Sequence, residues 1–250
     1  MQQNNSPVWA NPFPAQSIVN FSPLAAGRNG TLIAVVLDES GSMGRVREAT
    51  ISGLNEFIDG QKNAEGAGDA YLTIVKFDAP KITTLFENQH VKSVKALTGA
   101  DYQPGGGTNL MDAIGHTLEK VNKVLNSVPQ AERPGVLVVI VTDGEENSSR
   151  TYNTAQIKEM VKQSEASDWT FTFLGANVDA FSMGHSFGMQ QANTVSYSTN
   201  SMGATMDVLS KTTTRVRMAK SAGVSTADLY ASQTLYNADD RSKVMGGKDA

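Results

Sequence analysis

The chain has no cysteine in its 250 residues, and it has only three histidines. The absence of cysteine excludes both disulfide bonds and thiolate metal sites, and it weakly favours a reducing compartment. His90, His116 and His185 are too few and too scattered to build a histidine-rich metal centre. Any metal bound by this chain must therefore be held mainly by oxygen atoms.

Charge and long apolar runs are also scarce. Charged residues make up 18% of the chain, and 21 Lys and Arg against 25 Asp and Glu give a formal charge of −4. No basic run is present that could follow a phosphate backbone, so we expect no nucleic-acid partner. No apolar run approaches the ~18 residues of a spanning helix, and the N-terminus lacks the basic and apolar parts of a signal peptide. We therefore expect a cytoplasmic protein that is not bound to a membrane.

Buried strands alternate with amphipathic helices along most of the chain. The sequence predicts strands at residues 31–37, 70–77, 81–86, 135–142, 169–175 and 193–197. It predicts helices at about residues 46–60, 111–125, 157–161, 179–187 and 201–218. This alternation is typical of an α/β fold with a doubly wound, mostly parallel sheet and helices on both faces. The short segment between residues 77 and 81 predicts one antiparallel edge strand.

The two ends of the chain differ from its middle. Residues 1–29 hold four of the eight prolines and predict an N-terminal extension. Residues 30–218 predict the folded domain, and residues 219–250 predict a polar C-terminal tail.

Oxygen-bearing side chains follow the predicted buried strands. Asp38, Ser40 and Ser42 come directly after the first strand, Asp143 comes after the strand at 135–142, and Thr108 follows three consecutive glycines. Ligands of doubly wound sheets bind beyond the carboxyl ends of the strands, so these side chains are expected to meet there. Carboxylates and hydroxyls are ligands that hard divalent cations prefer. The glycines at 105–107 allow a close backbone approach that delivers the Thr108 hydroxyl.

The stretch Asp38-Glu39-Ser40-Gly41-Ser42, with the later Thr108 and Asp143, resembles the metal-ion-dependent adhesion site (MIDAS) of von Willebrand factor type A (VWA) domains. The resemblance covers roughly residues 31–200, and the members of the family that the chain resembles are of the bacterial or phage intracellular type. It implies that Ser40 and Ser42 bind the cation directly, that Thr108 does so when a ligand is present, and that Asp38 and Asp143 act largely through water. The implied cation is Mg²⁺, with Mn²⁺ or Ca²⁺ as alternatives.

The function that the resemblance implies is protein binding without catalysis. A partner protein would present an Asp or Glu as the sixth ligand of the cation, and by analogy that partner belongs to an AAA+ ATPase system. One alternative is a Mg²⁺-dependent phosphatase with Asp38 as nucleophile. Another is a structural or assembly component that uses residues 1–29 and 220–250 as arms. A serine hydrolase is disfavoured, because the GSMG stretch lacks the G-x-S-x-G turn.

Some predicted ligands, and three acidic residues near them, also have ordinary structural interpretations. Ser42 or Asp38 alone would be expected to cap a helix N-terminus. Glu145 and Glu146 are interpreted as a solvated first turn of helix, and Asp112 as a first-turn helix charge and not as a ligand. The joint occurrence of five oxygen donors favours the metal site for the set.

Overall fold

The computed structural model describes residues 27–176, 179–232 and 235–246. The strands are β1 (Thr31–Asp38), β2 (Ala70–Asp78), β3 (Lys81–His90), β4 (Gly135–Thr142), β5 (Trp169–Ala176) and β6 (Thr194–Tyr197). The helices are α1 (Arg47–Lys62), α2 (Leu110–Asn126), α3 (Thr154–Ala166), α4 (Ala180–Ser186), α5 (Met202–Ser221), α6 (Thr226–Ala231) and α7 (Ala238–Val244). Short 3-10 helices are η1 (Gly41–Val46), η2 (Val91–Ser93), η3 (Gln130–Glu132), η4 (Gln191–Asn193) and η5 (Thr199–Ser201).

The strands form one sheet in the order β3-β2-β1-β4-β5-β6. Neighbouring strands are parallel except for β3, which pairs with β2 in the antiparallel direction at one edge. The doubly wound, mostly parallel fold with one antiparallel edge strand is therefore confirmed.

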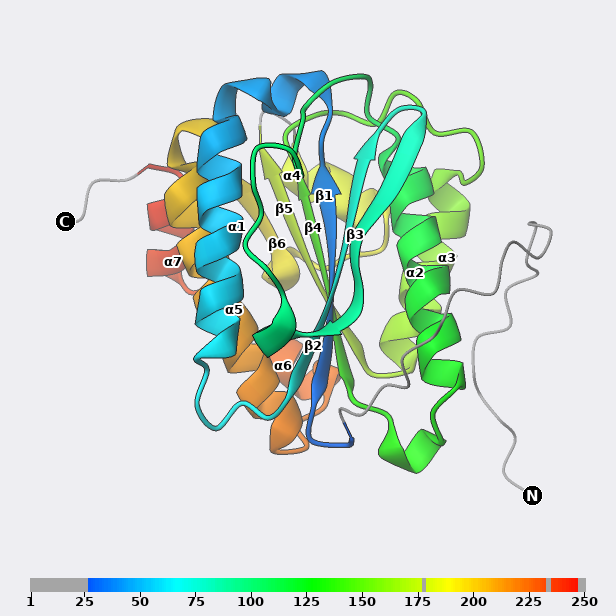
Figure 1. The fold of residues 1–250 in the computed structure, drawn as a ribbon. Coiled ribbons are helices and arrows are strands. Elements are labelled where there is room, and N and C mark those ends of the chain that lie inside the picture. Colours follow the sequence, from blue (N-terminus) through cyan, green and yellow to red (C-terminus); the bar gives the residue numbers. More distant parts are fainter. Residues whose placement is uncertain (1–26, 177–178, 233–234, 247–250) are drawn as a thin grey trace.

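Helices cover both faces of the sheet, with α1 and α5 on one side and α2 and α3 on the other (Figure 1). All eight residues of β1 are buried because this strand is central and covered on both faces. Alternate side chains enter opposite cores, since successive residues of a strand point to opposite faces. Ile33, Val35 and Leu37 pack on the side of α1 and α5, whereas Leu32 and Val36 pack on the side of α2 and α3.

The C-terminal region differs from the polar tail expected after residue 218. Helix α5 continues to Ser221, and two further helices, α6 and α7, follow it. Five side chains from this region are buried in the core on the α1 and α5 side: Leu229, Tyr230, Leu235, Tyr236 and Val244. The apolar residues are too few and too widely spaced among polar ones to reveal this packing in the sequence. The packed part of the domain thus extends well beyond the predicted boundary.

The C-terminal region also covers part of an exposed strand edge. Strand β6 pairs with β5 only from Phe173 onward. Just before that point, the Phe171 backbone N–H donates to the Tyr230 hydroxyl at 2.8 Å, and the hydroxyl in turn lies 3.4 Å from the Phe171 carbonyl. The Tyr230 hydroxyl therefore pairs with the Phe171 backbone N–H and C=O, which a neighbouring strand would otherwise do.

The predicted N-terminal extension falls on residues 1–29, of which residues 1–26 lie outside the described part. None of the described helices combines the length and apolar character that crossing a bilayer would require.

Candidate metal site

Topology brings the predicted site residues to one edge of the sheet. Leu37 of β1 pairs with Val141 of β4 in parallel register, so Asp38 and Asp143 follow neighbouring strand ends. The loops after these strands lie together at the top of Figure 1, beside the loop that leads to α2. We call Asp38, Ser40, Ser42, Thr108 and Asp143 the oxygen cluster. Four of its members are buried, and Ser42 is exposed.

The hydroxyls of the oxygen cluster lie close to one another and to Asp143. Ser40 Oγ and Ser42 Oγ are 3.1 Å apart, and Ser42 Oγ donates to Asp143 Oδ1 at 2.5 Å. A Cβ atom placed on Gly144 would lie 3.2 Å from Thr108 Oγ1 and 3.6 Å from Ser42 Oγ, so these two hydroxyls flank the same glycine. The structure thus brings together the side chains that the sequence predicts as ligands.

Asp38 is engaged by its surroundings through both carboxylate oxygens. Oδ1 accepts the Ser40 backbone N–H at 2.7 Å, and Oδ2 accepts the Thr142 hydroxyl at 2.6 Å. Burial raises the pKa of Asp38 above its usual value, and the hydrogen bonds from Ser40 and Thr142 partly oppose that rise. Asp38 therefore anchors the loop that carries Ser40. The Thr142 hydroxyl orients the Asp38 carboxylate, and Thr142 was not among the site residues that the sequence predicts.

Asp143 has one carboxylate oxygen without a partner. Its Oδ2 is buried and makes no hydrogen bond with any residue that the structure describes, although buried polar atoms are nearly always paired. Burial raises the pKa of Asp143, while the hydrogen bond from Ser42 and the charge of Arg45 act in the opposite direction. A divalent cation with its water ligands would supply the missing partner.

The composition of the oxygen cluster suits such a cation. Within the described part of the chain, no group of three or more His, Cys, Asp or Glu residues is arranged to hold a metal. A cation site here therefore needs donors besides these side chains, and the oxygen cluster offers three hydroxyls beside two carboxylates. Small hard cations accept ligand sets of this kind, which leave room for water. The residues present fit the predicted cation.

Comparison with known families decides the classification. The model of the von Willebrand factor type A domain matches residues 33–208, well over half of the chain. The chain belongs to the VWA family. No curated protein matches it.

Solved structures with a similar fold include proximal thread matrix protein 1 from the mussel byssus. One such structure has a TM-score of 0.52 and 15% sequence identity, and the match covers 73% of this chain and 45% of the other. Another, described as having a zinc-occupied MIDAS motif, has a TM-score of 0.50 and 15% identity, with 72% and 46% covered. The VWA chain described here thus spans less than half the length of these structures, and the similarity shows the fold.

The glycine loop of this VWA domain joins two neighbouring loops through backbone hydrogen bonds. Gly105 N–H donates to Glu39 O at 2.8 Å, Gly41 N–H donates to Gly106 O at 3.2 Å, and Ala79 N–H donates to Gly107 O at 2.8 Å. Gly106 has φ +62°, and a Cβ atom there would lie 2.7 Å from Ala79 O. Only glycine satisfies both conditions without strain.

Three further side chains fix the loop that carries Ser40. The Tyr102 hydroxyl donates to Asp38 O at 2.6 Å. Glu39 is buried, pairs with Lys76 at 2.8 Å and accepts the Gln103 N–H. Tyr102 and Lys76 are far from the motif in sequence, so only the fold reveals their contribution.

The loop after Asp143 holds Thr108 in place and does not form the helical turn that was expected. The Thr108 backbone N–H donates to Asn147 Oδ1 at 3.0 Å, and Thr108 O accepts from the Asn147 and Ser148 N–H groups. Glu146 accepts the Met111 N–H at 2.9 Å and so caps α2 from outside the helix. The interpretation of Glu145 and Glu146 as a first turn of helix is therefore wrong, because α3 begins only at Thr154.

Asp112 also serves this loop. It lies in the first turn of α2, as expected, and it accepts backbone N–H groups from Arg150, Thr151 and Tyr152, each at 2.9 Å. These bonds fix the path of the chain toward α3 and engage both carboxylate oxygens. Asp112 thus accepts backbone hydrogen bonds from this loop, and its predicted place in the first turn of a helix is confirmed.

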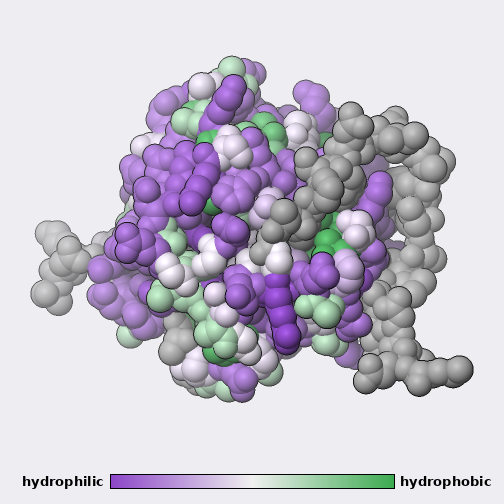
Figure 2. Space-filling model, turned by 60° about the horizontal axis from the view of Figure 1, so that its bottom comes forward, coloured by the Kyte–Doolittle hydropathy of each residue, from purple (hydrophilic) through white to green (hydrophobic). Residues whose placement is uncertain are grey.

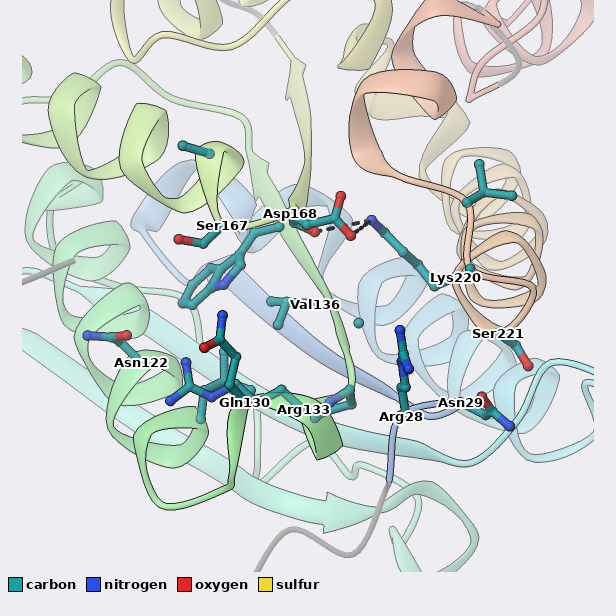
Figure 3. Close-up of a pocket in the computed structure, with 17 residues that line it drawn as sticks. Arg28, Asn29, Asn122, Gln130, Arg133, Val136, Ser167, Asp168, Lys220 and Ser221 are labelled. Atoms are coloured by element: carbon teal, nitrogen blue, oxygen red, sulfur yellow. Dashed lines mark hydrogen bonds and ion pairs between the residues drawn. The ribbon is translucent and has the colours of Figure 1, made fainter. Parts of the chain in front are cut away.

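A separate hollow of about 590 Å³ lies at the opposite end of the sheet. Its lining includes Arg28, Arg133 and Trp169, and Lys220 there is already paired with Asp168 (Figure 3). The Lys220 ammonium donates to Asp168 Oδ2 at 2.8 Å and to Thr226 Oγ1 at 2.7 Å. Seen from this end, the described surface is mostly hydrophilic, with apolar residues in small groups (Figure 2). No predicted site residue lies in this hollow, so the oxygen cluster remains the candidate site.

Proposed function

We propose that this VWA domain is a divalent-metal-dependent protein-binding module that captures a carboxylate of its partner. The observation that carries the proposal is the buried, unpaired Asp143 Oδ2 next to three converging hydroxyls. A buried carboxylate oxygen without a donor is costly, and a bound cation removes that cost.

The proposed cation is Mg²⁺, with Mn²⁺ or Ca²⁺ as alternatives. Ser40 and Ser42 would hold it directly, Thr108 would join when a partner binds, and Asp38 and Asp143 would hold its water ligands. When bound, the cation supplies an electrophilic position for an anionic oxygen of the partner. Zinc occupies the MIDAS motif in one of the mussel structures, which supports a divalent cation at the corresponding place.

The phosphatase alternative requires Asp38 to attack a phosphorus atom. Both oxygens of Asp38 already accept short hydrogen bonds, from Ser40 N–H and from the Thr142 hydroxyl. Lys76 forms an ion pair with Glu39 of this loop. These contacts favour binding over phosphoryl transfer, and we expect the purified protein to hydrolyse no phosphate or acyl ester in a metal-dependent way.

The identity of the partner is a further part of the proposal. An AAA+ ATPase system is one candidate, and an assembly role that uses the chain ends is the alternative. Pull-down with the full chain in Mg²⁺ and in EDTA tests both. Under the proposal a partner is retained only with metal, is lost with Asp143→Asn, and is kept with Asp207→Asn, an exposed carboxylate on α5. Equal recovery of the partner in EDTA would favour the assembly role.

A further inference from the structure

A pocket of about 360 Å³ opens beside the oxygen cluster. Its lining includes Glu145, two residues after Asp143, and Met111, three residues after Thr108. The opposite wall comes from α4 and the residues next to it, among them Asp179, Met183 and Phe187. A protein that places one side chain at the oxygen cluster would therefore have its neighbouring side chains over this pocket.

The pocket carries negative charge that its own surroundings do not neutralise. Three carboxylates line it, and no Lys or Arg does. Glu146 is occupied as the cap of α2. Glu145 is exposed, and its side chain makes no hydrogen bond or ion pair with any residue that the structure describes. Asp179 is also exposed, and within the described part of the chain its carboxylate accepts only the Ser182 N–H, at 3.0 Å.

The walls between these carboxylates are apolar and adaptable. Met111 and Met183 are partly buried and pack against the core on the α2 and α3 side, where Phe187 is buried. Methionine side chains are flexible and adjust to irregular shapes. A pocket with apolar walls and an acidic rim fits a side chain with an aliphatic stem and a cationic head, which is the character of Arg and Lys.

We propose that this pocket receives an Arg or Lys side chain of the same partner protein whose carboxylate binds at the oxygen cluster. The inference rests on the proposed function, and it adds a second requirement to it. The partner presents an acidic and a basic side chain next to each other on one loop. Two observations carry the proposal: charge complementarity, and a pocket lining that includes Glu145 and Met111, which closely follow Asp143 and Thr108 in the chain.

The first test addresses the pocket without the metal. The full chain, labelled at its methionine methyl groups, is titrated in EDTA with n-butylguanidinium, with n-butanol as the neutral probe. We expect a saturable shift of the Met111 and Met183 methyl resonances with the guanidinium probe alone. The resonances are assigned with Met111→Leu and Met183→Leu. The same shifts with n-butanol, or no shift of these two resonances, would overturn the proposal.

The second test uses peptides that carry both charges. Hexapeptides with one Asp are synthesised with Arg, or with its neutral analogue citrulline, one to three residues away. In Mg²⁺ we expect at least one Arg peptide to bind about fivefold more tightly than its citrulline counterpart, the scale of a partly screened ion pair. That preference should vanish in the double variant Glu145→Gln/Asp179→Asn and persist in the matched control Glu65→Gln/Asp207→Asn.

The two hypotheses fail in different ways. Metal-dependent peptide binding with no preference for Arg would overturn the pocket assignment and leave the proposed function intact. Peptide binding that is equal in Mg²⁺ and EDTA would overturn the proposed function, and the guanidinium titration would still decide the pocket. Asn is a good helix N-cap, so Asp179→Asn keeps the start of α4 while it removes the charge.

Discussion

Replacing Asp143 by asparagine separates the binding of a cation from the stability of the fold. The variant keeps an oxygen that accepts from Ser42, and it removes the charge of a carboxylate whose Oδ2 has no partner. The Asp143 charge also contributes, as the smallest of the causes, to the raised pKa of Asp38. Without metal, we therefore expect the variant to melt at the wild-type temperature or above it.

With metal, we expect the wild type to melt at a higher temperature than Asp143→Asn. A cation that binds only the folded state stabilises it by about 2.7 kcal/mol at a hundredfold excess over Kd. For a chain of this size, 1 kcal/mol moves the Tm by about 2–4 °C, so the wild-type Tm should rise by roughly 5–11 °C. The Asp143→Asn variant should lose most of that rise, because one of the two carboxylates that balance the cation is gone.

The assay is thermal unfolding followed by circular dichroism, in EDTA and in increasing Mg²⁺, Mn²⁺, Ca²⁺ or Zn²⁺. Asp207→Asn is the control, since that carboxylate is exposed on α5 and pairs with Lys211. An equal metal-induced rise in wild type and Asp143→Asn would refute the assignment of Asp143. A wild-type Tm that responds to none of these cations would refute the site as a whole.

Three further substitutions test the framework around the site. Thr142→Val removes the hydroxyl that orients Asp38 and should weaken metal affinity about 10–100-fold by calorimetric titration, whereas Thr142→Ser should restore it. Gly106→Ala forces a side chain into a positive φ and against Ala79 O, and should lower the urea-unfolding free energy by about 1–3 kcal/mol, while Gly105→Ala, with open space around it, should be much milder. Tyr230→Phe leaves the buried Phe171 N–H unpaired and should lower the unfolding free energy by about 1–3 kcal/mol; an unchanged urea midpoint would contradict that role.

The sequence predicted the sheet and the place of the site because both follow from local pattern. The continuous apolar runs before Asp38 and before Asp143 specify buried parallel strands, and parallel strands bring their carboxyl ends to one edge. The contacts that orient the cluster were not predictable in this way. Thr142 is the last residue of a strand and Tyr102 lies in an irregular loop, so their hydrogen bonds to Asp38 appear only when the chain is folded.

The packing of the C-terminal region was also not predictable from the sequence pattern. Residues 226–244 are rich in polar side chains, and hydrophobic periodicity over helices of six and seven residues is too short to be informative. Their packing is decided by single contacts with distant strands, such as the pairing of Thr172 Oγ1 with the Tyr236 hydroxyl at 2.7 Å.

The Tyr230 hydroxyl covers the part of the β5 edge that β6 leaves open, and this affects how copies of the protein behave toward one another. An uncovered strand edge offers unpaired N–H and C=O groups to any other chain in an extended conformation, and natural proteins cover such edges to prevent aggregation. Here the cover is the Tyr230 side chain of the short helix α6, in place of another strand. Proteolytic loss of the segment after α5 would therefore expose a template for strand addition, and the shortened protein would be expected to self-associate through β5.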